Sequence, residues 1–425
     1  MPASDNPFSE KPESDSTDPD FSANDLSADS NNVQPTESEA SDIDPILNEA
    51  LRVAEQEHQP ISEQDYQPSA KSVRPPGPGL FESICWMFGV IGAHFAGIMI
   101  FTVGAVVYLL VTSNLQQNAK AIQKQLTQFF DDHLLEMAGV EQGIFVLIVM
   151  LAVGLRLGKG VFGKLNTQPF AVSTGFLLLI SVIPLSLLSG ELYRLAFEAW
   201  SAFVEQVPAL KAFDEMQAME MVKQMTENSS LGALILVIAI FPAIGEELVF
   251  RGVIGRGLIA RWGLVPGMII TSIMFGLVHA HPAHVMAVIP LGMFMHYVYY
   301  VTRSFWAPVL VHFMNNAFAV TVTKEQTSLP EEAAKLADET QVAHPLITLS
   351  AALFVTVVCV YLWKSRSKYV TPDGSEWSPG YISNESPPLN KEIPLVRERA
   401  AFGYYPALFL LIINFVAMMY FFGFE

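Results

Sequence analysis

The chain contains a series of apolar segments, each about as long as a lipid bilayer is thick. A membrane helix needs roughly 20 apolar residues, and shorter spans are tolerated inside a bundle. Because lipid offers no hydrogen bonds to an exposed backbone, such segments fold as helices. The sequence therefore predicts an all-α, polytopic membrane helix bundle with about nine transmembrane helices. The predicted spans cover 84–112, 143–157, 169–189, 231–255, 264–281, 285–301, 305–323, 346–363 and 405–423.

Composition agrees with this fold class and separates the membrane body from an acidic tail. Of the residues, 51% are hydrophobic and 16% charged, and the mean hydropathy is +0.35, which excludes an ordinary soluble enzyme. Residues 1–70 hold 17 acidic residues against Lys11 and Arg52, so they carry about −15 of the net charge of −18. Residues 1–78 are predicted to form a disordered acidic cytoplasmic tail, whose partner the sequence does not identify. We expect the body to contact the lipid bilayer and no nucleic acid.

The distribution of Lys and Arg predicts the orientation of the spans. Cytoplasmic loops collect these residues near the ends of spans. An N-terminus in the cytoplasm places most of them inside, namely Lys71, Arg74, Arg156, Lys159, Lys164, Arg256, Arg261, Arg303, Lys364, Arg366 and Lys368. The exceptions are Lys120 and Lys124, which this orientation places outside. We therefore expect an integral, multi-pass membrane protein with a cytoplasmic N-terminus, located in the cell membrane if its source is prokaryotic.

Two segments between the spans have distinct patterns. Residues 191–225 show apolar residues at helical spacing with acidic residues between them, which is typical of helices that lie on a surface. Residues 364–404 contain the turn-forming stretches TPDG, SPG and SPPLN. The first segment is predicted to be amphipathic and extracytoplasmic, and the second to be an irregular cytoplasmic loop.

Two adjacent carboxylates interrupt the fourth apolar segment, in the stretch GEELVFRG. Glu246 and Glu247 are the only acidic residues inside the nine predicted spans, and an ionisable group in a bilayer indicates a functional site. Glu247 and Arg251 are four residues apart, the spacing of an ion pair on one helix face. That pair leaves Glu246 without a partner on its own helix, and such a carboxylate suits a general base. The structural alternative is a charge cluster that only fixes helix packing.

Two later spans also carry polar groups at helical spacing. FGLVH places Phe275 and His279 on one helix face, and HFMNN does the same for His312 and Asn316. Each short pattern is weak by itself and occurs often by chance. Three such patterns in this order, all on membrane helices, form a strong signal for one polar site.

Four other histidines are interpreted as structural. His94 in the first span and His296 in the sixth are predicted to be hydrogen-bonded core residues, as a lone His in an apolar helix usually is. His281 and His284 belong to the stretch HAHPAH, whose spacing invites a metal interpretation. Because they fall at a turn between spans, where polar residues are expected, we predict no direct catalytic role for them.

The patterns EExxxR, FxxxH and HxxxN on separate membrane helices resemble the three motifs of the CAAX-protease and bacteriocin-processing family. These proteins are intramembrane endopeptidases and include the type II CAAX prenyl proteases. The resemblance covers about residues 230–323, a quarter of the chain, and every motif position is matched. At the last motif position this chain has Asn316, where some members have Asp.

The resemblance implies a peptidase that hydrolyses a peptide bond of a membrane-associated protein or peptide, including lipidated ones. It implies two residues that activate a water and two that face the oxyanion of the tetrahedral intermediate. In that order the catalytic residues are Glu246, His279, His312 and Asn316, with Glu247, Arg251 and Phe275 in support. The chemistry agrees with the residues themselves, since amide hydrolysis needs a base, an electrophilic stabiliser and a confined water.

This interpretation divides the chain into four parts. The tail (1–78) precedes the first spans and the amphipathic segment (79–230). A helical core with the family motifs follows (231–323), and then the last spans with their cytoplasmic loop (324–425).

Alternatives remain open at this stage. Two His and one Glu suit a catalytic zinc, so Glu246, His279 and His312 are the ligands if the site depends on a metal. We expect a metal-free site without a cofactor, because Asn316 and Arg251 suit direct activation of water. A proton-coupled transporter is a second alternative, although no inverted repeat of the motif-bearing half is found. A non-catalytic membrane adaptor is a third, and the completeness of the motifs disfavours it.

Overall fold

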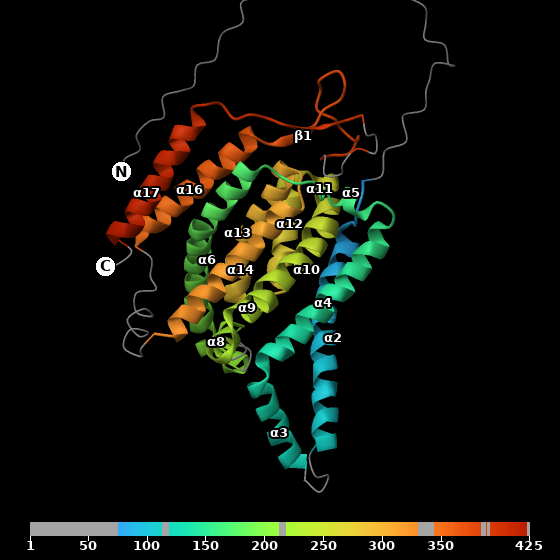
Figure 1. Cartoon of the computed structure of the whole chain (residues 1–425), viewed down its shortest axis with the longest axis vertical. Coiled ribbons are helices and arrows are strands. Elements are labelled where there is room, and N and C mark those ends of the chain that lie inside the picture. The colour runs from blue at the N-terminus through green and yellow to red at the C-terminus, as the bar shows by residue number, and fades with distance from the viewer. Residues whose placement is uncertain are drawn as a thin grey trace, which may run out of the picture. The chain divides into compact units, whose positions relative to one another are not determined.

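A computed structural model describes residues 75–112, 119–211, 218–329, 344–383, 388 and 392–422 of the chain (Figure 1). The predicted tail lies outside the described residues except for 75–78, so its disorder and its cytoplasmic location stay predictions. The described elements belong to one unit, Ala70–Glu425.

The apolar segments form helices, and the predicted all-α class is confirmed. The longer helices are α2 (Leu80–Thr112), α3 (Ala119–Asp132), α4 (Leu134–Leu157), α6 (Val172–Gln206), α8 (Ala218–Asn228), α12 (Leu264–Leu277), α13 (Pro282–Thr302), α14 (Trp306–Thr327), α16 (Pro345–Lys364) and α17 (Tyr404–Phe422). Shorter elements are α5 (Val161–Lys164), η2 (Pro208–Leu210), α9 (Leu231–Leu234), η3 (Ile235–Ile240), α10 (Phe241–Val249), η4 (Phe250–Gly255) and α11 (Arg256–Trp262).

Seven helical stretches of the described chain are long and apolar enough to cross a membrane. They are α2, α4, α6, the continuous run Leu231–Trp262, α13, α16 and α17. The other two predicted spans correspond to α12, which has 14 residues, and α14, which is less apolar. Both pack against α13 inside the bundle, where length and apolarity are less constrained than beside lipid. The predicted number of nine transmembrane helices is therefore approximate.

The helices with the polar motifs lie at the centre of the bundle. We compare the buried share of residues in the most apolar stretch of each helix. It is 56% in Leu231–Trp262 and 61% in α13, but only 11% in α2 and 6% in α17. Figure 1 shows α10, α12, α13 and α14 between α2 and α4 on one side and α16 and α17 on the other. Polar groups on the central helices are thus shielded from lipid by the outer ones.

The boundaries of α4 correct one sequence inference. α4 begins at Leu134 rather than at 143, so Glu141 lies inside a membrane-spanning helix. Glu246 and Glu247 are therefore not the only acidic residues in the spans. The Glu141 carboxylate contacts Nδ1 of His94 on α2, and this partner offsets the cost of placing a carboxylate there.

The predicted surface segment 191–225 is also organised differently. α6 is a single helix of 35 residues that continues through the first half of this segment to Gln206. Arg194 forms ion pairs with Glu191 and Glu198, at i,i+3 and i,i+4, which stabilise the polar extension of the helix. Residues 212–217 lie outside the described part, and α8 follows them. The extracytoplasmic location of the segment stays a prediction.

The helical run that carries the two glutamates is interrupted by π-helical turns on both sides of α10. They are η3 before it and η4 after it, although the sequence predicted one continuous span over 231–255. Pro242 lies in the first turn of α10, and its missing N–H removes one ordinary helical hydrogen bond at the first junction. Each π turn changes the direction of the side chains that follow it, and such turns are frequent at functional sites.

The loop predicted to be irregular contains a small sheet. β1 (Ser367–Tyr369) and β2 (Leu395–Arg397) pair antiparallel, with Ser367 opposite Arg397. The Tyr369 hydroxyl donates to Oδ1 of Asn166 at 2.7 Å, and this joins the sheet to the loop before α6. Burial raises the pKa of Tyr369, so the phenol keeps the proton that it donates. The turn residues predicted an irregular loop, whereas the contact between Tyr369 and Asn166 holds its small sheet against the loop before α6.

α2 and α4 approach each other most closely at Gly97. A methyl group added at this position would lie 2.6 Å from the Cα of Glu141, whereas one added at Gly92 on the same helix meets nothing within 4 Å. Gly97→Ala is therefore expected to destabilise the protein by about 1–3 kcal/mol through overpacking. Gly92→Ala is expected to be neutral or stabilising by up to about 1 kcal/mol, the gain in helix propensity. Thermal unfolding in detergent measures both, and equal effects would contradict the contact.

Candidate active site

The two glutamates of α10 have different surroundings. Glu247 is fully buried, and its Oε1 accepts a hydrogen bond from Nη1 of Arg251 at 2.7 Å. The predicted ion pair is therefore present. The side chain of Glu246 is almost as deeply buried, but its carboxylate makes no hydrogen bond within the described chain, and Oε2 is shielded from solvent. One glutamate is thus held by partners and the other is left available.

Arg251 connects three central helices. Its guanidinium is fully buried, donates through Nη2 to the carbonyl oxygen of Gly292 on α13 at 2.8 Å, and lies 4.8 Å from the ring centroid of Phe275 on α12. A guanidinium can serve several partners at once because its donors form a rigid planar fork. The sequence predicted the pairing with Glu247 but not the contacts across the bundle.

His312 on α14 lies between the two glutamates. Its Nδ1 is 2.9 Å from Oε1 of Glu247, and its Nε2 is 3.9 Å from Oε2 of Glu246. A carboxylate only accepts, so Nδ1 is assigned as a donor to Glu247. This contact fixes the ring and directs Nε2 toward the available glutamate.

Phe275 and His279 adjoin this cluster, as their spacing predicted. The ring of Phe275 makes edge contacts with the rings of His279 and His312, at centroid distances of 5.1 and 5.8 Å. The predicted span 264–281 is too long, however, since α12 ends at Leu277 and His279 lies in the turn that follows. Nδ1 of His279 donates to the carbonyl oxygen of Phe275 at 3.0 Å, so the two residues stay close although the helix has ended. The same bond leaves Nε2 of His279 as an acceptor.

Asn316 lies one turn beyond His312 and contacts the first π turn. Its Nδ2 donates to the carbonyl oxygen of Ile238 in η3 at 3.2 Å, and its Oδ1 accepts from Asn315 at 3.4 Å. Ser186 on α6 donates in turn to Oδ1 of Asn315 at 3.0 Å. Sequence reasoning missed Asn315, although it directly precedes a motif residue, and Ser186 has no signal in the sequence.

The predicted residues therefore converge to different degrees. Glu246, Glu247, Arg251, Phe275 and His312 form one contact cluster, and His279 joins it through Phe275. Within the described chain no hydrogen bond links His279 to Glu246. No group of three or more His, Cys, Asp or Glu side chains in this part of the chain is placed to hold a metal ion, and the metal-free site and its zinc-dependent alternative both stay predictions.

Side chains of α4 and α2 pack next to Glu246 on α10. A methyl group added at Gly245, next to Glu246, would lie 2.4 Å from the ring of Phe145 on α4. The ring of Phe145 stacks on His94 with centroids 4.0 Å apart, and His94 contacts Glu141. The predicted hydrogen bond of His94 is therefore present, but its side chain is 26% exposed, so His94 is not a core residue.

The corresponding prediction for His296 is wrong. Its ring is fully buried, and neither nitrogen has a hydrogen-bond partner in the described chain. A methyl group added at Gly255 would lie 1.8 Å from Cε1 of His296, so the ring fills the space that this glycine leaves open. His296 thus packs by shape rather than by polar contacts.

His281 and His284 lie at the start of α13, as expected for a turn between spans. The ring of His284 makes an edge contact with the ring of His279, at a centroid distance of 4.8 Å. His281 contacts the rings of Phe197 and Trp200 on the extension of α6. Aromatic side chains of α6 therefore cover the turn that carries His279.

Comparisons with known proteins agree with this site. Residues 228–318 match the protein-family model "Type II CAAX prenyl endopeptidase Rce1-like", and all seven predicted site residues lie in the matched segment. A protein of Bacillus subtilis (strain 168), described as "Putative membrane peptidase YdiL", is 32% identical over 92 residues. These residues are 22% of this chain and 38% of the length of that relative. No solved structure matches.

The buried ion pair predicts a large difference between two arginines. Arg251→Met leaves Glu247 with one cationic neighbour fewer in the core, and breaking a buried pair costs about 3–5 kcal/mol of stability. Arg156 is the matched control, because its partner Glu82 is 40% exposed, and such pairs contribute about 0–1 kcal/mol. Denaturant unfolding of Arg251→Met and Arg156→Met in detergent compares them. Equal losses would show that Arg251 is not the support of the site.

Proposed function

We propose that this protein is a membrane-embedded endopeptidase that hydrolyses a peptide bond of a membrane-associated protein or peptide. The observation that carries the proposal is the carboxylate of Glu246, which is 8% exposed and lacks a hydrogen bond within the described chain. Buried carboxylates with a structural role have partners, as Glu247 has. An available carboxylate that faces Nε2 of His312 suits a general base.

In the proposed reaction Glu246 takes a proton from water, and the water oxygen attacks the carbonyl carbon of the substrate. The proton then passes to the nitrogen of the scissile bond, and the carbon–nitrogen bond breaks. His279 orients the same water through Nε2, which is free to accept because Nδ1 donates to Phe275. General base catalysis of this kind contributes roughly 10²–10⁴-fold in rate.

His312 and Asn316 are proposed to stabilise the oxyanion that forms on the substrate. Because Nδ1 of His312 donates to Glu247, donation from Nε2 requires the imidazolium form of the ring. In that form His312 and Arg251 balance the charges of the two glutamates, so the buried cluster is neutral. Asn316 uses one amide hydrogen for Ile238 and keeps the other for the oxyanion.

Direct activation of water by Glu246 and His279 is preferred over a zinc-dependent mechanism. His312 offers only Nε2 toward Glu246, and no three candidate ligands of the described chain converge. The alternative remains testable by chelation. A proton-coupled transporter and a non-catalytic adaptor are less favoured, because the match to the Rce1-like family model and the membrane peptidase of Bacillus subtilis support a protease. The substrate class includes lipidated proteins, as the name of the family model suggests.

The proposal is tested by peptide cleavage with the purified full-length chain. Prenylated peptides and transmembrane peptides are offered to wild type and to Glu246→Gln, His279→Ala, His312→Ala and Asn316→Ala. Loss of the base is expected to lower kcat about 10²–10⁴-fold, and loss of one oxyanion donor about 10²–10³-fold. Mass spectrometry of the products measures each rate.

Glu136→Gln serves as the matched control, because Glu136 is an exposed glutamate in the first turn of α4. Its kcat is expected to equal that of wild type. Undiminished cleavage by Glu246→Gln would contradict the mechanism. Loss of cleavage on chelation, followed by recovery with zinc, would replace the metal-free site by the zinc-dependent one.

A further inference from the structure

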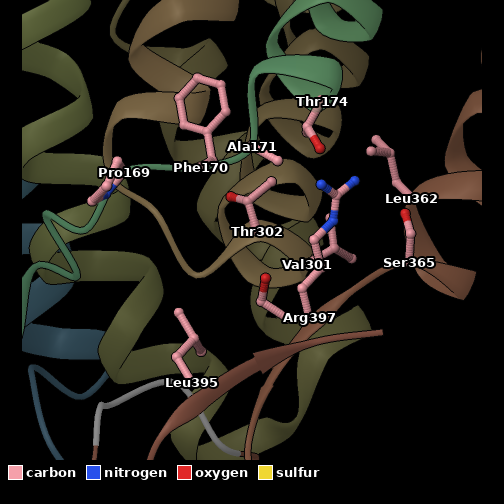
Figure 2. Close-up of a pocket in the computed structure, with 11 residues that line it drawn as sticks. Pro169, Phe170, Ala171, Thr174, Val301, Thr302, Leu362, Ser365, Leu395 and Arg397 are labelled. Carbon is pink, nitrogen blue, oxygen red and sulfur yellow. The ribbon is translucent and has the colours of Figure 1, made fainter. Parts of the chain in front are cut away.

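A pocket outside the proposed active site lies where α6 begins and where α13 and α16 end (Figure 2). Its volume is about 160 Å³, many times the roughly 10–15 Å³ that a single water requires by the same measure. None of the residues that line it belongs to the catalytic cluster. The polar side chains around it are Thr174, Thr302, Ser365, Ser367 and Arg397.

Thr174 is a buried polar side chain directed into this pocket. The residue is only 4% exposed, and its hydroxyl makes no hydrogen bond to a described residue. Thr302 and Ser365 differ, since each donates its hydroxyl to a carbonyl of its own helix. Figure 2 shows the Thr174 oxygen facing the same space as the Arg397 guanidinium. Because the Thr174 oxygen opens onto the pocket and is not used by another described residue, it is available to a ligand.

Arg397 supplies positive charge to the pocket. It ends β2, and its Nη1 reaches back toward the start of α6, 3.5 Å from Oγ of Ser173. Arg366 and Lys368 in the same loop are each paired with glutamates. Arg397 forms no ion pair with a described carboxylate. Its charge is therefore not neutralised by the surrounding chain.

The start of α6 adds backbone donors. α6 has 35 residues, and its N-cap residue Ala171 provides no side-chain cap, so the first N–H groups are not satisfied by a side chain. The N-terminus of a long helix attracts anions through these donors and the helix dipole. Phe170, Ala171 and Thr174 all line the pocket, which places this end of the helix at its wall.

We propose that this pocket binds a phosphate group, carried by a phospholipid headgroup or by a free phosphate. Three kinds of donor converge on it, namely a planar guanidinium, an unpartnered hydroxyl and helix N-terminal amides. A phosphate has enough acceptor oxygens for all three, and Arg binds phosphate through two parallel hydrogen bonds. The apolar part of the lining, Phe170, Leu362 and Leu395, suits the carbon atoms next to a lipid phosphate.

The position of the pocket agrees with a lipid source. Three membrane helices begin or end at it, α6 at Val172, α13 at Thr302 and α16 at Lys364, so it lies at the level where membrane helices leave the hydrocarbon. Basic pockets between membrane helices bind phospholipid headgroups in this zone. The proposal is independent of the peptidase activity, because none of its residues takes part in the proposed reaction.

Binding is tested on the full-length chain in a neutral detergent by isothermal titration calorimetry. The probes are dioctanoyl phosphatidic acid, inorganic phosphate, and dioctanoylglycerol, which is the same lipid without its phosphate. We expect saturable binding of a phosphate-bearing probe at one site. Arg397→Gln is expected to weaken it about tenfold or more, the loss of a charge-assisted hydrogen bond. The isosteric change Thr174→Val is expected to weaken it several-fold without disturbing the fold.

Arg399→Gln is the matched control, since Arg399 is exposed, lies two residues away and does not line the pocket. It removes the same charge and is expected to bind like wild type, as is Glu246→Gln. Binding of phosphatidic acid alone assigns the site to lipid, and equal binding of inorganic phosphate assigns it to a free phosphate. Binding of dioctanoylglycerol as tight as that of phosphatidic acid would overturn the proposal. The proposal would also be overturned if neither phosphatidic acid nor inorganic phosphate bound, or if Arg397→Gln and Thr174→Val both bound the phosphate probe as tightly as wild type.

Discussion

The centre of the bundle depends on how one buried carboxylate is neutralised. Oε1 of Glu247 accepts from Arg251 on its own helical run and from His312 on α14. Arg251 in turn reaches α13 and the ring of Phe275 on α12. A buried charge is tolerated only when it is paired and hydrogen-bonded, so these helices cannot be separated without exposing it. The contacts of Glu247 and Arg251 thus fix the relative positions of the elements that carry the site.

This arrangement explains why two adjacent glutamates have different chemistry. Successive residues on a helix point in directions about 100° apart, so Arg251, which pairs with Glu247, forms no ion pair with Glu246. Because Pro242 has no N–H, the carbonyl of Ile238 lacks its ordinary helical donor, and it accepts from Asn316. Glu246 is left facing Nε2 of His312, at a distance of 3.9 Å. Glu247 therefore orients His312, and His312 faces Glu246.

Sequence patterns predicted the parts of the site that are local in the chain. The i,i+4 spacing predicted the pair Glu247–Arg251, which helix geometry determines, and the neighbourhood of Phe275 and His279, which a hydrogen bond maintains past the end of α12. Contacts between helices were not predictable, and neither His312 with Glu247 nor Ser186 with Asn315 has a sequence signal. The same limit explains the error at Glu141. Hydropathy began the span at 143, after this residue, whereas its partner His94 on another helix allows the helix to begin earlier, at Leu134. The bundle was thus predictable from hydropathy, while its internal pairing was not.

The segment that matches the Rce1-like family model depends on other helices for its packing. It covers 228–318, yet Phe145, which fills the space beside Gly245, comes from α4, and Ser186, which holds Asn315, comes from α6. Gly245 and Asn315, which make these contacts, directly precede Glu246 and Asn316 in the chain. A displacement of α4 or α6 therefore moves the candidate catalytic side chains. Sub-ångström shifts are transmitted because packed interiors have little free volume. The helices outside the matched segment therefore contribute to the geometry of the site, and α6 carries both Ser186 and the pocket residue Thr174.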